Sequence, residues 1–134
     1  MILDTGPLVA AANARDPDHN PCRDLLAGAR GQIIVPAVVI AEAAFLIGKS
    51  GSARAEAMLL RSLASPRYRV EAPTAEDLGR AAELVEQYAD LRLGSTDALV
   101  IAAAERNQDA VVATLDHRHF SVVRSTIGPL TLVP

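Results

Sequence analysis

The stretch Ile2-Leu3-Asp4-Thr5-Gly6-Pro7-Leu8 decides the fold. Ile2 and Leu3 form a short apolar run, typical of a buried strand, and the run ends at an acidic residue. Pro7 suits the first turn of a helix, because a residue in that turn needs no backbone N–H donor. The stretch therefore predicts a strand, a turn and a helix, with Asp4 just past the end of the strand.

The same alternation of short apolar runs and helical segments continues along the chain. The β-branched residues of 32–35, stopped by Pro36, predict a second strand, and further strands are expected at 68–71, 110–113 and 130–133. Helices are expected at 17–29, 37–47, 53–63, 75–89 and 96–107. Strands that alternate with helices indicate an α/β domain, a three-layer α/β/α sandwich with a mostly parallel central sheet. A single domain over residues 1–134 is expected, because no linker or repeat interrupts the pattern.

Two of the expected helices carry specific predictions. Thr74, followed three residues later by Asp77, resembles a capping box, and Leu78, Ala81, Ala82, Val85 and Tyr88 or Ala89 are expected on the inner face of that helix. Ser95 or Thr96 is expected to cap the helix that ends at Asn107.

The composition limits the ways in which a nucleic acid could bind. The chain has two Phe, two Tyr and no Trp, so aromatic platforms for stacking bases are scarce. The net charge is −3, and the 13 basic residues do not make the surface generally basic. A polyanion would therefore be held by individual arginines and by metal.

Cysteine usage and hydropathy bear on the compartment. Cys22 is the single cysteine and cannot form an internal disulfide, and the sequence opens at Met1 without the basic and apolar segments of a secretion signal. The apolar stretch 33–48 is interrupted by Pro36 and Glu42 and falls short of the ~20 residues that cross a bilayer. These features predict a cytoplasmic protein without a membrane partner.

Three acidic residues lie at the ends of predicted elements. Asp4 and Asp116 follow apolar strands, where a carboxylate is costly unless it reaches solvent, backbone donors or a cation. Asp97 falls in the first turn of a helix, whose dipole favours an anion. Each position has an ordinary structural alternative, a turn for Asp4 and Asp116 and a helix cap for Asp97.

Glu42 is the most informative acid, because it is the only charged residue between Arg30 and Lys49. The Ala-rich segment 37–47 predicts a buried helix closed by Gly48, and Glu42 is expected to be a buried acid on it. A buried ion pair with an arginine is the alternative, and metal binding is the favoured explanation.

Four acids without other ligand types match the oxygen donors that Mg²⁺ or Mn²⁺ requires. A zinc site is not expected, since the spacing of His117 and His119 matches no closed zinc pattern.

The chain resembles the PIN-domain family, and within it the VapC-type toxins of bacterial toxin–antitoxin pairs. The resemblance rests on four segments in order: residues 2–8, Pro36-Ala37-Val38-Val39-Ile40-Ala41-Glu42, residues 88–91 with Ser95-Thr96-Asp97-Ala98, and Ala113-Thr114-Leu115-Asp116. They extend over nearly the whole chain.

The resemblance implies a parallel α/β/α fold in which Asp4, Glu42, Asp97 and Asp116 meet at one end of the sheet and bind one or two Mg²⁺ or Mn²⁺ ions. Such a site hydrolyses RNA with a water nucleophile, leaves 5′-phosphate ends and needs no catalytic histidine. The resemblance also implies that Thr5 and Thr114 supply supporting hydroxyls and that Asp90 is a peripheral acid.

The implied activity is that of an endoribonuclease toxin that inhibits translation and growth. Its partners would be an RNA substrate, a small antitoxin that presents an Arg or Lys to the carboxylates, and a second copy in a homodimer. Arg92, Arg118 and Arg124 lie near the acidic loops in sequence and are expected to contact RNA.

Other enzyme classes do not fit. A phosphoaspartate phosphatase requires a second Asp where Gly6 stands, and a receiver domain requires a late lysine, whereas Lys49 is the sole lysine. Gly48-Lys49-Ser50 lacks the upstream glycine of a phosphate-binding loop. The remaining alternative is a non-catalytic domain of the same fold that binds RNA or a protein.

Overall fold

Five strands form an all-parallel sheet in the computed structural model, which describes residues 1–134 apart from the side chain of Ser50. The strand order is β3-β2-β1-β4-β5, with β1 in the centre. The strands are β1 (Ile2–Leu3), β2 (Ile33–Pro36), β3 (Tyr68–Glu71), β4 (Val111–Ala113) and β5 (Thr131–Val133). All five were predicted within one residue of these bounds.

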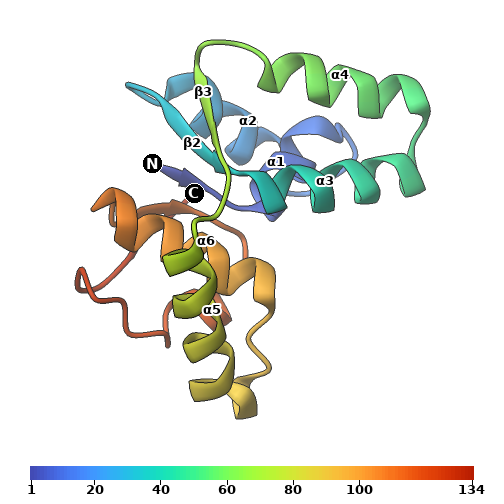
Figure 1. Ribbon diagram of the computed structural model, residues 1–134. Coiled ribbons are helices and arrows are strands. Elements are labelled where there is room, and N and C mark those ends of the chain that lie inside the picture. The colour runs from blue at the N-terminus through green and yellow to red at the C-terminus, as the bar shows by residue number, and fades with distance from the viewer.

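Helices cover both faces of the sheet (Figure 1). Helices α5 and α6 pack against each other on one side, and α1 to α4 gather on the other, where the α3–α4 hairpin extends away from the strands. The helices are α1 (Thr5–Ala12), α2 (His19–Gly28), α3 (Ala37–Ser50), α4 (Ala53–Leu63), α5 (Ala75–Gln87), α6 (Ser95–Asn107) and α7 (His117–Phe120), with a 3₁₀ turn η1 (Ala89–Leu91). The predicted three-layer sandwich is confirmed.

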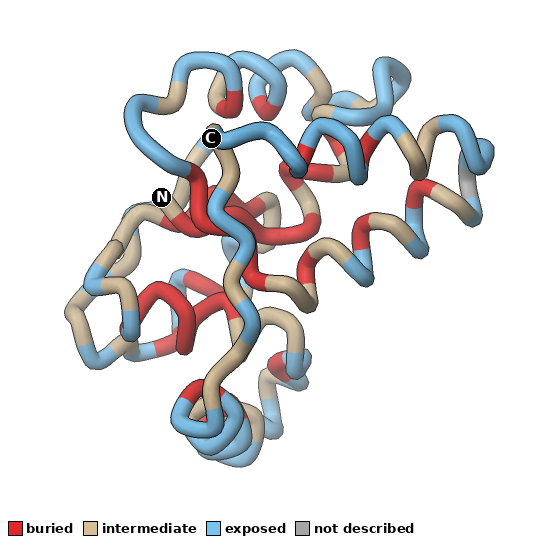
Figure 2. Tube along the Cα trace, turned by 45° about the horizontal axis from the view of Figure 1, so that its top comes forward, coloured by how far each residue is buried: buried red, intermediate tan, exposed pale blue. Residues whose placement is uncertain are grey.

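The core is aliphatic and centres on the strands and α6 (Figure 2). Residues 100–105 of α6 are all buried, in keeping with its run of alanines between Val100 and Glu105. Phe120 of α7 is the one phenylalanine in the core and is 2% exposed. Among the residues that the structure describes, no helix combines the length and apolar character that crossing a bilayer requires.

Helix α3 differs from the prediction in burial and in length. Phe45 is 66% exposed and Glu42 is also exposed, because α3 leaves the sheet as one arm of a hairpin and only the stripe through Val39 and Ala43 faces the core. Gly48 does not end the helix: a Cβ there would lie 3.1 Å from a carboxylate oxygen of Glu56 on α4, so the glycine allows the two arms to approach closely. An apolar composition indicated burial that the hairpin geometry does not provide.

Of the two predicted helix caps, one is confirmed and one is wrong. At α5 the capping box is confirmed: the Thr74 hydroxyl accepts from the Asp77 N–H, and the Asp77 carboxylate accepts from the Thr74 N–H. The predicted inner face of α5 was wrong in part: Ala81 is buried, but Leu78 is 55% exposed and Ala82 is also exposed, while Asp77 and Leu84 are buried. At α6 the cap is Gly94 without a side-chain bond, so Ser95 lies in the first turn instead of capping it.

Replacing Thr74 by Ala should lower the free energy of unfolding by about 1 kcal/mol, because one first-turn N–H loses its acceptor. Urea denaturation measures the change. Ser95→Ala is the matched control and should change stability by less than ~0.5 kcal/mol, since its hydroxyl caps nothing. Equal losses in the two variants would contradict this description of the caps.

Two ion pairs fix α6 against α5. Glu105 of α6 accepts two bonds from Arg80 at 2.8 and 3.1 Å, and Arg106 donates to the buried Asp77 at 2.9 Å. The carboxylates of Glu105 and Asp77 are buried, whereas the side chains of Arg80 and Arg106 are 24% and 33% exposed, so pairing of the two buried acids makes the relative position of the helices specific. This arrangement holds the helix whose first turn carries Asp97.

Candidate active site

The site lies where the strand order reverses. From β1 the chain proceeds to β2 and β3 on one side, whereas β4 and β5 lie on the other, so β1 and β4 flank the switch point of the parallel sheet. Ligands of open parallel sheets bind beyond the carboxyl ends of the strands at this point. Asp4 directly follows β1, and Thr114 and Asp116 follow β4.

Gly6 lets the first turn of α1 approach the segment after β4. A Cβ on Gly6 would lie 3.3 Å from the Cβ of Leu115, which is tighter than ordinary side-chain contact. The glycine of the opening stretch therefore has a packing role next to the acids.

All four predicted acids line one open depression at this end of the sheet. They come from the end of β1, from α3, from the first turn of α6 and from the start of α7. The residues lining the depression are Asp4, Thr5, Gly6, Glu42, Leu46, Asp97, Leu115, Asp116, His117 and Arg118. The structure thus brings together residues that are up to 112 positions apart in sequence, between Asp4 and Asp116.

Asp4 is 5% exposed and is the most deeply placed acid. One carboxylate oxygen accepts from the Thr5 N–H at 2.7 Å, and the other accepts from the Thr114 hydroxyl at 2.7 Å. Burial raises the pKa of Asp4 despite these bonds, and the charges of Glu42 and Asp116 raise it further. Asp4 is therefore held in a fixed orientation beside like charges.

The two threonines each orient a carboxylate. The Thr5 hydroxyl donates to Glu42 at 2.8 Å and ties the exposed α3 residue to the start of α1. Thr114, which is fully buried, donates to Asp4 and also accepts from the Asp116 N–H at 3.0 Å. The hydroxyl of Thr114 thereby joins the acids that follow β1 and β4.

The pKa of Asp97 is raised by its burial and by the negative charges around it. Burial, followed by the charges of Asp4 and Asp116, raises its pKa from 3.8 to about 6, and His119 offsets this only in part. A carboxyl at the positive end of a helix would ordinarily titrate low, so burial and the neighbouring acids together outweigh the helix dipole here.

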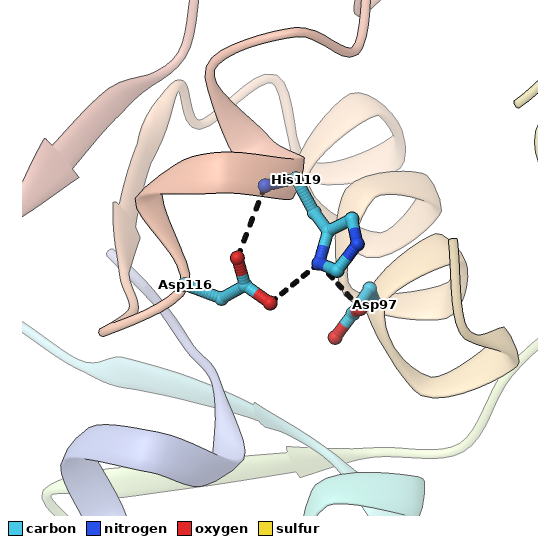
Figure 3. Close-up of side chains that lie close together, drawn as sticks. All are labelled: Asp97, Asp116 and His119. Carbon is cyan, nitrogen blue, oxygen red and sulfur yellow. Dashed lines mark hydrogen bonds and ion pairs between the residues drawn. The ribbon is translucent and has the colours of Figure 1, made fainter. Parts of the chain in front are cut away.

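Asp116 begins α7 and is paired with a histidine of the same helix (Figure 3). Its carboxylate accepts from the His119 backbone N–H at 3.0 Å and lies 2.5 Å from His119 Nδ1, and a carboxylate oxygen of Asp97 lies 3.9 Å from the same nitrogen. Burial raises the pKa of Asp116, but the two bonds from His119 outweigh it and lower the pKa overall. The bond to Asp116 raises the pKa of His119.

Sequence reasoning missed His119, because residues 117–119 read as a loop. They form the short helix α7, in which positions 116 and 119 share one side. An acid that can cap a helix, followed three residues later by a histidine, is the signal that could have identified the pair.

The donor set fits a hard divalent cation. Among the described side chains, no arginine or lysine forms an ion pair with any of the four acids; only His119 does. Carboxylate oxygens in this number are the ligands that Mg²⁺ and Mn²⁺ prefer. A divalent ion would also relieve the repulsion that raises the pKa of Asp97.

Of the three predicted RNA-contacting arginines, Arg118 alone is among the residues that line the depression. Arg118 is exposed. Arg92 is exposed after η1 in a left-handed backbone conformation, with φ 57°, and the backbone of Arg124 donates to the Tyr88 hydroxyl. Asp90 is exposed on η1 and does not line the depression.

The metal-free chain should gain stability when Asp97 is replaced by Asn. A folded-state pKa of about 6, above the unfolded value of 3.8, means that Asp97 favours folding below pH ~4 and loses this contribution as the pH rises through about 6. With its side chain 22% exposed, the variant should be about 1–2 kcal/mol more stable than wild type at pH 7.5.

Urea denaturation in EDTA between pH 4 and pH 8 measures this difference. It should shrink toward zero as the pH falls below 6. A difference that does not change with pH would show that Asp97 does not carry the repulsion.

The chain belongs to the PIN-domain family, whose model matches residues 1–125. It is 33% identical over 135 aligned residues to ribonuclease VapC26 of Mycobacterium tuberculosis, and the alignment spans 100% of both proteins. The family membership that the four segments predicted is confirmed.

Solved structures show the same fold. VapC20 of Mycobacterium tuberculosis, a sarcin-ricin loop cleaving toxin, matches with a TM-score of 0.82 at 22% identity over 88% of this chain and 91% of that one. The VapBC2 complex of Rickettsia felis, bound to a DNA fragment from its promoter, matches with a TM-score of 0.70 at 20% identity over 100% of both chains. A toxin–antitoxin complex from Klebsiella pneumoniae matches with a TM-score of 0.73 at 16% identity over 91% of each chain.

Proposed function

We propose that the chain is a divalent-metal-dependent endoribonuclease of the VapC type, the toxin of a toxin–antitoxin pair that inhibits translation and growth. The observation that carries the proposal is the convergence of Asp4, Glu42, Asp97 and Asp116 in one depression without an arginine or lysine paired to them. The ribonuclease relative supports RNA as the substrate. An RNA target and a block of translation place its action in the cytoplasm.

The four carboxylates would hold one or two Mg²⁺ or Mn²⁺ ions. When bound, such an ion lowers the pKa of its water and stabilises the charge that develops on phosphate. Thr114 keeps Asp4 and the backbone of Asp116 in register, and Thr5 holds Glu42 toward the other acids. The chain thereby presents oxygen ligands in a fixed arrangement, which limits reorganisation during the reaction.

Arg118 is placed to contact the RNA backbone. It lies at the edge of the acidic depression and is exposed, and no described carboxylate pairs with its side chain. Phosphate contacts of this kind position a nucleic acid without reading its sequence. Arg92 and Arg124 would extend the contact along the surface.

Sequencing of 5′-phosphate RNA ends tests the proposal. Cells that express the wild type should show new ends at discrete sites, and cells that express Asp4→Asn at the same level should not. Identical sets of ends in both would favour the alternative, a non-catalytic domain that binds RNA or a protein.

An antitoxin and a second copy of the chain are the proposed protein partners. Met58 of α4 is 59% exposed and Phe45 of α3 is 66% exposed, and an apolar depression that contains no acidic residue lies between α1, α2 and α4. Exposed apolar side chains beside an apolar depression favour an interaction surface here. The solved toxin–antitoxin complexes that share this fold support a small antitoxin as the partner at this surface.

Size-exclusion chromatography with and without the product of a small adjacent reading frame tests both partners. The chain alone should elute as a dimer, and the mixture should elute as a larger complex. A chain that elutes as a monomer, at the same volume with and without the second protein, would contradict the proposed partners.

A further inference from the structure

His119 faces the acids with one ring nitrogen and the backbone with the other. Its Nε2 lies 3.1 Å from the carbonyl oxygen of Leu91, and its Nδ1 lies 2.5 Å from Asp116 and 3.9 Å from Asp97 (Figure 3). One ligand atom from each of these three polar side chains can be chosen so that all lie within 4.8 Å of one another. This spacing is compatible with three donors around one ion.

The contact with Leu91 determines which nitrogen can bind a metal. A carbonyl oxygen only accepts, so Nε2 must carry the hydrogen. Nδ1 faces Asp116 and Asp97, and in the metal-free chain it shares a hydrogen with the Asp116 carboxylate at 2.5 Å. An ion that binds Nδ1 would displace that proton, which is released to solvent. Metal-binding histidines characteristically donate their second N–H to a carbonyl or carboxylate in this way.

We propose that His119 Nδ1 joins Asp97 and Asp116 as a nitrogen ligand of the divalent ion, so that the site selects Mn²⁺ over Mg²⁺. The inference rests on the proposed function, since it assigns a further ligand to the same centre. Imidazole binds transition metals well, whereas Mg²⁺ prefers oxygen donors and retains its waters. A nitrogen donor added to the acids would weaken the relative preference for Mg²⁺ and so favour Mn²⁺.

Binding of Mn²⁺ and Mg²⁺ to full-length variants tests the ligand. In His119→Gln, the new amide takes the place of Nε2 and can still donate to Leu91, but nothing replaces Nδ1. The variant should bind Mn²⁺ at least about tenfold more weakly than wild type and bind Mg²⁺ with an affinity changed by less than about twofold. His19→Gln, on α2 and outside the acidic depression, should bind both ions as wild type does.

Pulsed electron paramagnetic resonance on the Mn²⁺-loaded protein gives a readout that does not depend on affinity or activity. The wild type and His19→Gln should show coupling of Mn²⁺ to a ring ¹⁴N, and His119→Gln should not. Circular dichroism confirms that each variant is folded.

Several outcomes separate this inference from the proposed function. Mn²⁺ bound without ¹⁴N coupling in the wild type, or coupling that persists in His119→Gln, would overturn the nitrogen ligand and leave an all-oxygen metal site. An equal loss of both metals in His119→Gln would show that the residue only positions Asp116. A wild type that binds neither ion would contradict the metal-dependent function as well.

Discussion

Asp97→Asn is expected to reduce kcat for metal-dependent RNA cleavage by about 10²–10³-fold or more while the fold persists, because a lost metal ligand removes several kcal/mol of transition-state stabilisation. The ion pair that the structure shows for Asp97 is the 3.9 Å contact with His119, so little else depends on its charge. Initial rates on a defined RNA at saturating Mn²⁺ measure the effect.

Asp90→Asn provides the control for this measurement. Asp90 is also an aspartate, but it is exposed on η1 and lies outside the depression. Its replacement should leave the rate within about twofold of wild type, as expected for a surface substitution. Full activity in Asp97→Asn, or an equal loss in both variants, would refute the role of Asp97.

Thr114→Val should lower activity by about 10–100-fold with almost no change in side-chain shape, which is typical for loss of a group that orients a metal ligand. The hydroxyl is fully buried and serves both Asp4 and the backbone of Asp116. Its removal leaves the buried Asp4 carboxylate and the partly buried Asp116 N–H without that partner and should cost about 1–3 kcal/mol of stability.

Thr114→Ser separates orientation from packing, because it keeps the hydroxyl and loses the methyl group. It should recover most of the activity while remaining less stable than wild type. Wild-type rates in Thr114→Val would show that the register between β1 and β4 does not depend on this hydroxyl.

The parts of the fold set by local pattern could be predicted from sequence. Strands such as Ile2–Leu3 are short, apolar and bounded by turn residues, and the Thr74–Asp77 box marks the start of α5 by local hydrogen bonds alone. The order of the acids relative to these elements then placed Asp4 and Asp116 at the same edge of a parallel sheet.

The features that the sequence did not reveal depend on how elements pack. Glu42 was expected to be buried because its neighbours are apolar, but α3 projects as a hairpin arm and leaves Glu42 and Phe45 exposed. On α5, Asp77 is buried and Leu78 is exposed, because Arg106 on α6 pairs with Asp77. The helix that packs against a face decides which of its residues are buried, and hydrophobic periodicity does not identify that helix.

Anomalous diffraction from crystals soaked in Mn²⁺ would test most directly whether the acids share a cation. A peak enclosed by the carboxylates of Asp4, Asp97 and Asp116, and absent from Asp97→Asn crystals, is the predicted result. The prediction would be contradicted if crystals soaked at saturating Mn²⁺ showed no anomalous peak in the acidic depression and the same protein still cleaved RNA in EDTA.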